Sequence, residues 1–473
     1  MNKLKIGYIA AAALMIGTAQ ALDAQVQATD AGKQVTLTLE DCRKMAEDNN
    51  PYVRNARLGR HAAEAMKGEA LAEYFPKVSL NAFSFYAFQP MLELGITDIL
   101  GESAFSNSVQ NVINALASKY GFNPIYSTLK YGVTANVMVM QPLFAGGRIV
   151  NGNRLAALGA EAAALQENIT TRNILEETEN SYWMVVSLEE KLKTLDELQS
   201  LVDTLYKDVS SACAAGLATE NDMLQVRLKQ NEIKAGKIQV NNGIRLSKMN
   251  LLNSIGMDYS PYRSITNDSI PYLDDILLTD RIDSIRTPDE YFIPEEEAMA
   301  GRDEAKLLAI SVEAKKLEKK MATGNALPEI GIGATYGYSD IIDRASMNGA
   351  VFASVKIPIS DWGKTAKQMQ RHDYYIQQAE NEKEYMDSQL VLEIRKLWLD
   401  LNSAWEQMSV ASESAKAARS SVMKLTSYYE AGLSPLSELL QAQTELRQAT
   451  DTYVDRCIDY RKALQAYRNR TRK

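Results

Sequence analysis

The chain has 473 residues, of which 46% are hydrophobic and 24% charged, with a formal net charge of −8. This length allows about three ordinary domains or one large elongated unit, and the apolar content excludes a disordered chain. The acidic balance argues against a nucleic-acid partner, which needs a clustered surplus of lysine and arginine. With only His61 and His372 as histidines, the sequence predicts no enzyme activity, no metal site and no cofactor.

Residues 1–21 have the pattern of a secretory signal peptide. Lys3 and Lys5 precede an apolar run, and Ala19-Gln20-Ala21 forms a small-x-small cleavage site. No later segment has the ~18 consecutive apolar residues of a membrane-spanning helix. The chain is therefore predicted to be exported, and to be either soluble or held in a membrane by strands, which lipid permits only as a closed β-barrel.

The cysteines do not form a disulfide framework in the sequence. Cys42, Cys213 and Cys457 are an odd and widely spaced set. We interpret them as unpaired, with a Cys42–Cys457 bridge between neighbouring helices as the alternative.

Four segments alternate between two kinds of side chain with a period of two, which is typical of strands. They span residues 78–88, 131–141, 330–339 and 350–359. Each is about ten residues long, the length of a tilted barrel strand that crosses a bilayer. A soluble β-sandwich would alternate in the same way, and four strands are too few to close a barrel, so the membrane interpretation requires an oligomer.

Long helices are predicted where proline is absent, because proline breaks helix interiors. No proline lies between Pro142 and Pro261 or between Pro358 and Pro435, and in the second stretch apolar residues recur in steps of four and three from Leu390 to Tyr429. Such stripes pack helices side by side at shallow angles. The predicted long helices are residues 147–214, 222–255, 363–430 and 436–468. The first would be ~100 Å long, too long for a compact globule.

The chain contains one internal repeat. Residues 141–148 align with residues 357–364 at an offset of 216, and residues 74–78 align with residues 326–330 at an offset of 252. We therefore divide the mature chain into a first repeat (22–255), a connector (256–295), a second repeat (296–468) and a tail (469–473). The first repeat carries an insertion, residues 89–130, with an amphipathic segment at Asp98–Tyr120 that Gly121 is predicted to end.

These features resemble the TolC-like outer-membrane efflux channels over nearly the whole mature chain. The most specific match is a pair of turns, Ala-Gly-Leu-Ala-Thr-Glu-Asn-Asp at 215–222 and Ala-Gly-Leu-Ser-Pro-Leu-Ser-Glu at 431–438. The resemblance implies a mainly α fold with a small β part, built as two repeats of helix, β-hairpin, very long helix and long helix. It implies a homotrimer with a 12-stranded barrel in outer-membrane lipid, an extracellular insertion, an equatorial connector and a periplasmic coiled-coil tunnel.

The resemblance also implies a passive exit duct of a tripartite efflux or type I secretion system. Its partners would be a periplasmic adaptor protein and an inner-membrane pump of the RND, ABC or MFS type. The competing interpretation is a soluble periplasmic coiled-coil scaffold, which explains the helical stripes but not the four alternating segments. The sequence predicts neither the substrate, nor the class of pump, nor the role of residues 89–130.

The resemblance assigns three sets of residues. The adaptor-docking tip would be Ala215, Gly216, Leu217, Ala431, Gly432 and Leu433. The gate would be Asp222, Tyr429, Ser434, Glu438 and Gln441. The strand–helix junctions would be Pro142, Gly147, Pro358 and Gly363.

Two of these sets have simpler alternatives. In the gate we expect a hydrogen bond between Tyr429 and Asp222, whereas Ser434 replaces an arginine of the best-known members, and Gln441 makes one acidic ring neutral. Tyr429 could instead simply end the coiled-coil stripe. Leu217 and Leu433 would be exposed if they dock a partner, or tucked between the helices if the turns are plain connections.

Overall fold

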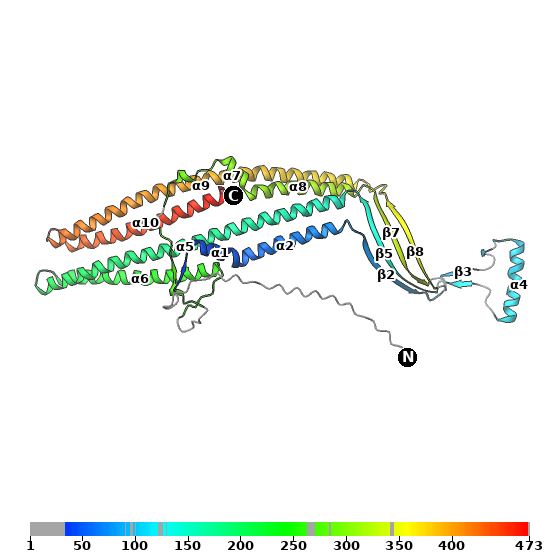
Figure 1. Cartoon of the computed structure of the whole chain (residues 1–473), viewed down its shortest axis with the longest axis horizontal. Helices are drawn as coiled ribbons and strands as arrows, with labels where there is room; N and C mark the ends of the chain where they lie inside the picture. Colours follow the sequence, from blue (N-terminus) through cyan, green and yellow to red (C-terminus); the bar gives the residue numbers. More distant parts are fainter. Residues whose placement is uncertain are drawn as a thin grey trace.

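The molecule is an elongated body with its long helices at one end and a small sheet toward the other (Figure 1). The computed structural model describes residues 34–89, 91–94, 98–99, 101–121, 126–128, 130–262, 270–282, 285–340 and 345–471. The predicted signal peptide, residues 1–21, lies outside the described residues. None of the helices within the described ranges is long and apolar enough to cross a membrane.

Two copies of one structural unit make up most of the chain. The first contains α2 (Pro51–Ala72), β2 (Lys77–Tyr86), β5 (Tyr131–Ala145), α5 (Arg148–Ala214) and α6 (Glu220–Ser254). The second contains α8 (Asp303–Gly324), β7 (Glu329–Asp340), β8 (Ser346–Lys356), α9 (Lys364–Glu430) and α10 (Leu436–Thr471). The predicted fold class and its repeated order of elements are confirmed.

The four long strands form one antiparallel sheet in the order β2-β5-β7-β8. Each repeat contributes a hairpin, and the pairing of β5 with β7 joins the two repeats. The sheet ends with β2 on one side and β8 on the other. Its edges therefore belong to different repeats.

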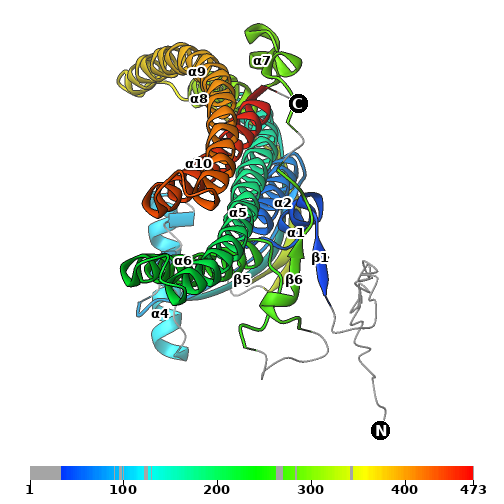
Figure 2. The ribbon, with the colours of Figure 1, turned by 90° about the vertical axis from the view of Figure 1, so that its left-hand side faces the viewer.

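The long helices form two antiparallel pairs, α5 with α6 and α9 with α10. The 67 residues of α5 and the 67 of α9 each correspond to a length of ~100 Å. Both pairs turn at the end of the molecule farthest from the sheet (Figure 1), and an end-on view shows the four helices along one curved layer (Figure 2). This curvature suits a wall around a central space better than a compact bundle.

The apolar stripes of the sequence form two separate cores. Near the tip, one cluster contains Leu195, Leu198, Val202, Leu205, Val209, Val226, Ile233, Val422, Leu436, Leu439, Ala442 and Leu446. Midway along the helices, the second cluster is rich in aromatic side chains, with Tyr182, Trp183, Tyr460 and Tyr467 among its buried members. In this second cluster Tyr460 packs against Trp405, and Tyr467 packs against Trp398.

The connector and the first described residues cross the middle of the helices. β1 (Val35–Leu37) pairs in parallel with β6 (Ile276–Leu278), next to α1 (Leu39–Asn49). A short helical segment, η2 (Leu273–Asp275), comes directly before β6, and two more, η3 (Pro288–Tyr291) and α7 (Glu295–Gly301), follow it. Cys42 and Cys457 both lie in the core midway along the helices, and no disulfide joins them among the described residues.

The insertion in the first repeat extends past the outer end of the sheet (Figure 1). A short ribbon of β3 (Leu92–Leu94) and β4 (Tyr126–Thr128) leads to α4 (Ala104–Tyr120). The helix begins at a capping box on Ser103 rather than at Asp98, and it ends at Gly121 with a φ of 67°. Serine at the N-cap satisfies a backbone donor that would otherwise be unpaired, which explains the later start.

The strand ends differ most from the predicted ones in β5 and β8. β5 continues past Pro142 to Ala145 with an irregular register after Pro142, whereas β8 starts at Ser346 and ends at Lys356, before Pro358. Pairing between β2 and β5 stops at Met140, so Pro142 has a strand neighbour on only one side. A proline without an N–H is tolerated there because no partner on the other side needs that donor.

Candidate functional site

The two faces of the four-stranded sheet differ in chemistry. Paired residues share a face, so the register assigns each side chain. One face carries Val78, Leu80, Ala82, Tyr86, Tyr131, Val133, Val137, Val139, Ile330, Ile332, Tyr336, Tyr338, Met347, Val351 and Val355, with Ser84, Gln141 and Asp340 as its polar members. The opposite face carries Ser79, Asn81, Thr134, Asn136, Thr335, Ser339, Asn348, Ser354 and several glycines, together with the apolar residues Phe83, Phe85, Met138, Met140 and Phe352. We call them the apolar face and the polar face.

Tyrosines gather at the outer end of the apolar face. Tyr86 and Tyr131 are cross-strand neighbours, and Tyr336 and Tyr338 lie on the same face of β7. Tyrosine and tryptophan are enriched where a protein surface passes from hydrocarbon to water, since each combines an apolar ring with a polar group. An apolar face with tyrosines at its end is therefore typical of a lipid-facing surface.

The polar face contains two aromatic rings that lie over glycine. A Cβ atom at Gly132 would overlap the ring of Phe85, and one at Gly333 would overlap the ring of Phe352. The rings therefore lie flat against the strands, because the glycines leave room for them. This keeps the polar face free of tall side chains at these two positions.

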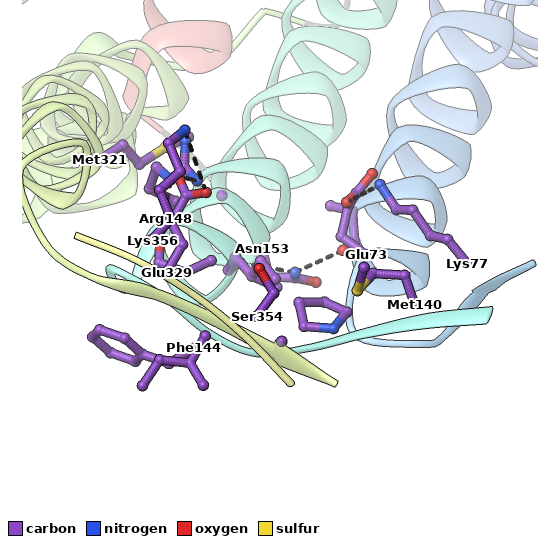
Figure 3. Close-up of a pocket in the computed structure, with 17 residues that line it drawn as sticks. Glu73, Lys77, Met140, Phe144, Arg148, Asn153, Met321, Glu329, Ser354 and Lys356 are labelled. Atoms are coloured by element: carbon purple, nitrogen blue, oxygen red, sulfur yellow. Dashed lines mark hydrogen bonds and ion pairs between the residues drawn. The ribbon is translucent and has the colours of Figure 1, made fainter. Parts of the chain in front are cut away.

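A cavity of about 650 Å³ lies where the polar face meets the helices (Figure 3). Arg148, at the start of α5, is hydrogen-bonded to Glu329 and to Asn325, the latter at 3.2 Å. Lys77 pairs with Glu73 at 2.7 Å on the other side of the cavity. These two ion pairs thus lie in a lining that also holds the apolar side chains of Met140, Phe144 and Met321, and Arg148 joins the first repeat to the second.

The junctions between strands and long helices share a left-handed backbone. In the first repeat Gly146 and Gly147 have φ values of 61° and 74°, and in the second Trp362 and Gly363 have 54° and 81°. Gly147 and Gly363 each precede the first residue of a long helix. Of the four predicted junction residues, these glycines are at the helix starts, whereas Pro142 lies within β5 and Pro358 follows β8.

At the tip, each long helix ends in the same hydrogen-bonded turn. The amides of Leu217 and Leu433 each donate to a carbonyl five residues earlier, at 2.8 Å in both turns. Gly216 and Gly432 adopt φ values of 77° and 72°, which glycine tolerates without a steric penalty. The two leucines are 84% and 76% exposed, so they are not tucked between the helices.

The predicted gate residues lie at this tip, but they bond locally within one chain. The carboxylate of Asp222 accepts from the amide and hydroxyl of Thr219, at 3.0 and 2.7 Å, as a helix capping box. No hydrogen bond joins Tyr429 to Asp222 in the part of the chain that the structure describes. Burial, and then the nearby charges of Asp222 and Asp208, raise the pKa of Tyr429.

The other gate residues form a polar row along α10. The Ser434 hydroxyl donates to Glu438 at 2.7 Å, and the Gln441 amide donates to Glu445 at 3.0 Å. Glu438, Gln441 and Glu445 are all exposed. Glu445 therefore supplies a carboxylate one turn beyond Gln441, the position at which the sequence predicts a neutral ring.

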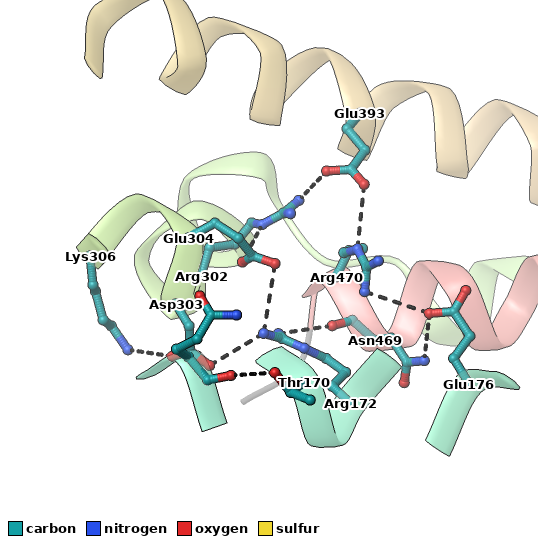
Figure 4. Close-up of polar contacts among 11 residues, drawn as sticks. Thr170, Arg172, Glu176, Arg302, Asp303, Glu304, Lys306, Glu393, Asn469 and Arg470 are labelled. Carbon is teal, nitrogen blue, oxygen red and sulfur yellow. Dashed lines mark hydrogen bonds and ion pairs between the residues drawn. The ribbon is translucent and has the colours of Figure 1, made fainter. Parts of the chain in front are cut away.

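Sequence reasoning missed a buried polar network where α5, α8, α9 and α10 meet (Figure 4). Arg302 is 2% exposed and donates to Glu393 at 2.7 Å, while Arg470 binds the same carboxylate at 3.3 Å. Arg172 forms an ion pair with Asp303 at 3.3 Å. The network fixes the end of α10 to three other helices, and no local pattern could have signalled it because its members are far apart in the sequence.

Comparisons with known proteins now identify the family. The model of the outer membrane efflux protein family matches residues 42–257 and 298–469, which is more than half of the chain. The chain belongs to the outer membrane efflux protein family. A search of curated proteins finds no match.

Solved structures agree in fold. A membrane protein of Pseudomonas aeruginosa is 14% identical with a TM-score of 0.71, over 92% of this chain and 93% of that one. The CmeC outer membrane channel of Campylobacter jejuni is 14% identical with a TM-score of 0.70, over 92% and 85%. The outer membrane protein VceC of Vibrio cholerae is 15% identical with a TM-score of 0.67, over 92% and 96%.

Family membership settles three of the predictions made from the sequence. The TolC-like resemblance is confirmed, the protein is an outer-membrane efflux protein, and it is not an enzyme. The competing interpretation of a soluble periplasmic scaffold is wrong, because this family is one of outer-membrane channels that serve efflux.

Proposed function

We propose that three copies of the chain form a passive exit duct of a tripartite efflux or type I secretion system. The observation that carries this proposal is the open sheet with one apolar and one polar face. Within the described chain β2 and β8 each have a single strand neighbour, so each presents an edge of unpaired backbone groups. Such edges are costly in lipid, and three sheets joined edge to edge would close into twelve strands with none left.

The two faces fix the orientation of such an assembly. The apolar face with its tyrosines would contact outer-membrane lipid, and the polar face would line a water-filled lumen. The cavity beside Arg148 and Glu329 lies on the polar side, so it would open to that lumen. The ~100 Å helices would then continue the duct across the periplasm.

The tip is the surface that we propose for docking of a periplasmic adaptor. Leu217 and Leu433 are large apolar side chains held outward by rigid turns, and water is an unfavourable environment for both. An adaptor that covers them would link the duct to an inner-membrane pump of the RND, ABC or MFS type. Exported drugs, toxic solutes or polypeptides would be selected by that pump.

Docking can be tested by comparing leucines of similar exposure. Leu217→Asp together with Leu433→Asp is expected to abolish the resistance of cells to an exported toxic compound while the protein remains folded in the outer membrane. Leu246→Asp, at an exposed leucine away from the tip, is the matched control and should keep resistance. Equal resistance in all three strains would remove the tip from the docking surface.

We also propose that the tip carries the gate. In a trimer the helices α9 and α10 of one copy would approach those of the next, which would bring the Glu438 and Glu445 rows around a common axis. Three like charges around one axis repel, so a closed state would require bound cations between these carboxylates. Asp222 and Tyr429 would control how tightly neighbouring helix pairs approach.

The assembly itself is tested by imaging and by conductance. Particles in detergent should appear by negative-stain electron microscopy as three-fold tubes with a long helical part and a cap of membrane thickness, and they should conduct ions in planar bilayers. Monomeric particles, or tubes that never conduct, would refute the duct.

A further inference from the structure

The cavity where α1, α2, α5 and α10 meet has a volume of about 400 Å³. Its lining contains the arginines Arg43, Arg57, Arg172 and Arg468, and we call it the arginine pocket. We propose that the arginine pocket binds a small oxyanion with two or more negative charges, of the polycarboxylate or phosphate class. This inference goes beyond the proposed duct, because a passive duct needs no ligand at this place.

The pocket is built from matching faces of regular helices. In α10 the lining residues Gln465, Arg468 and Asn469 follow the spacing of three and four that places side chains on one face. In α5 the lining residues recur in steps of one and three between residues 167 and 175. These faces come from both repeats, and α1 adds Arg43, so the pocket is a product of the fold rather than a row of charges on one helix.

The lining has a surplus of positive charge. Four arginines and two glutamates, Glu47 and Glu167, give a formal charge of 4 − 2 = +2. The whole chain has a formal charge of −8, so this local surplus runs against the composition. Arginine binds the oxygens of carboxylates and phosphates with two parallel hydrogen bonds. The charge and the side-chain type of the lining therefore favour an anionic ligand.

Two of the four arginines are already neutralised by partners. Arg43 pairs with Glu179 at 2.9 Å. Arg172 pairs with Asp303 at 3.3 Å and donates to the backbone carbonyl of Asn469 at 3.2 Å (Figure 4). These contacts hold Arg43 and Arg172 in place and account for them without a ligand.

The other two arginines, Arg57 and Arg468, keep donors for a ligand. Arg57 has its ion pair with Glu167 at 3.6 Å, but Arg60 already binds that carboxylate at 2.6 Å. Arg468 forms no hydrogen bond or ion pair with any residue that the structure describes. Its charge acts on Glu179, but burial raises the pKa of Glu179 to about 7, so near neutral pH that carboxylate carries only part of a negative charge.

Neutral donors complete the site. The Asn168 amide and the Thr171 hydroxyl line the pocket, and neither has a hydrogen-bond partner within the described part of the chain. Arg57 and Arg468 enter the pocket from different helices, α2 and α10. A ligand with several anionic oxygens can meet both guanidinium groups and these donors together, so the arrangement favours a multivalent anion over a monovalent one.

The position of the pocket along the helices indicates a soluble ligand. Residue 168 lies 168 − 148 = 20 residues beyond the start of α5, which corresponds to ~30 Å from the sheet. A lipid headgroup beside the strands would not reach so far. Glu47 and Asn168 are exposed, so the pocket is open to solvent. Since one water occupies ~30 Å³ of liquid, the cavity has room for a small molecule in place of about a dozen waters.

A bound anion would join parts of the chain that are distant in the sequence. α2 belongs to the first repeat, and α10 is the last helix of the second. An anion held by Arg57 and Arg468 would connect these two helices through charge-assisted hydrogen bonds. Because only the folded chain brings the two arginines together, binding should also stabilise the fold by mass action.

Isothermal titration calorimetry on the full chain in detergent tests the site. The probes are citrate and inorganic phosphate, with acetate as the monovalent comparison, all at one ionic strength so that screening is constant. We expect citrate or phosphate to bind at one site per chain, and acetate to bind roughly tenfold more weakly or worse. Arg57→Gln together with Arg468→Gln should weaken the better probe roughly tenfold or more, because hydrogen bonds to charged groups are lost.

The matched control is Arg54→Gln. It removes the same charge from an exposed position of α2, three residues before Arg57. It should change the affinity less than about twofold, because exposed charges are screened by salt. Arg57→Gln and Arg468→Gln are also measured singly, so that misfolding of one variant leaves the other to decide. A rise in melting temperature with the better probe, absent from the double variant, checks the same site independently.

Three results would overturn the site. The first is that neither citrate nor phosphate binds at millimolar concentrations. The second is that Arg54→Gln weakens binding as much as the pocket variants do, and the third is that the double variant binds as the unchanged protein does. In the last two cases the anions would be attracted by surface charge alone. None of these results bears on the duct, because its three-fold form and its conductance are measured without an added anion.

Discussion

Replacing Gly146 with alanine should loosen the junction between the two repeats, and Gly147→Ala is its matched control. Both glycines have positive φ, so alanine costs ~1–2 kcal/mol at either position. At Gly146 the added Cβ would also lie 2.9 Å from the carbonyl carbon of Gly324 and closer still to its oxygen. At Gly147 the nearest atom is the side-chain nitrogen of Asn151 at 3.5 Å, an ordinary contact.

Overlap with a packed backbone costs ~1–3 kcal/mol beyond the conformational term. Hydrogen exchange can measure the extra destabilisation of Gly146→Ala relative to Gly147→Ala. An amide that exchanges through local opening exchanges faster when the free energy of that opening is lower. With RT at about 0.6 kcal/mol, amides around Gly324 and the first turn of α5 should exchange roughly 5–150-fold faster in Gly146→Ala than in Gly147→Ala. Gly324→Ala should resemble Gly146→Ala. Equal exchange in the two neighbouring variants would refute the close backbone contact.

Three further predictions follow from buried or gate residues. Burial raises the pKa of Glu179 to about 7, so between pH 5 and pH 7.5 the folded chain holds a proton that the unfolded chain releases. The melting temperature should therefore fall over this range, by an amount that corresponds to roughly 3 kcal/mol of unfolding free energy per chain. Glu179→Gln should flatten this pH profile, and an unchanged slope in the variant would contradict the prediction. Tyr182→Phe removes the hydroxyl that donates to Asp280 at 2.7 Å and should lower the free energy of unfolding, measured by denaturant titration, by ~1–3 kcal/mol. An unaltered free energy of unfolding would be the contrary result. Tyr429→Phe combined with Asp222→Ala should loosen the closed tip and raise single-channel conductance, and unchanged conductance would count against this gate.

Much of the fold could be predicted from the sequence because its packing surfaces are periodic. The buried side chains from Leu195 to Val209 in α5 follow the period-3.5 stripe, and the strands follow a period of two. In a long helix or strand the spacing of apolar residues recurs many times, so these elements could be identified from the sequence alone. The repeat offset and the turns at Gly216 and Gly432 then identified the family.

Short or non-local features gave no such signal. β1 and β6 are three residues long, and only their pairing across more than 200 residues makes them strands. The network around Arg302 depends on four helices meeting, which no single segment encodes. The site prediction was limited for a related reason: a capping box within the first turn of α6 competes for the same Asp222 carboxylate that the gate prediction gives to Tyr429.

At one pair of corresponding positions, the two repeats have the same backbone conformation but very different side chains. Gly146 and Trp362 occupy corresponding positions with nearly the same φ, 61° and 54°. Gly146 must be small because the backbone of Gly324 lies against it inside the chain. Trp362 is 98% exposed in the single chain, and in the proposed trimer we expect a neighbouring copy to cover its ring.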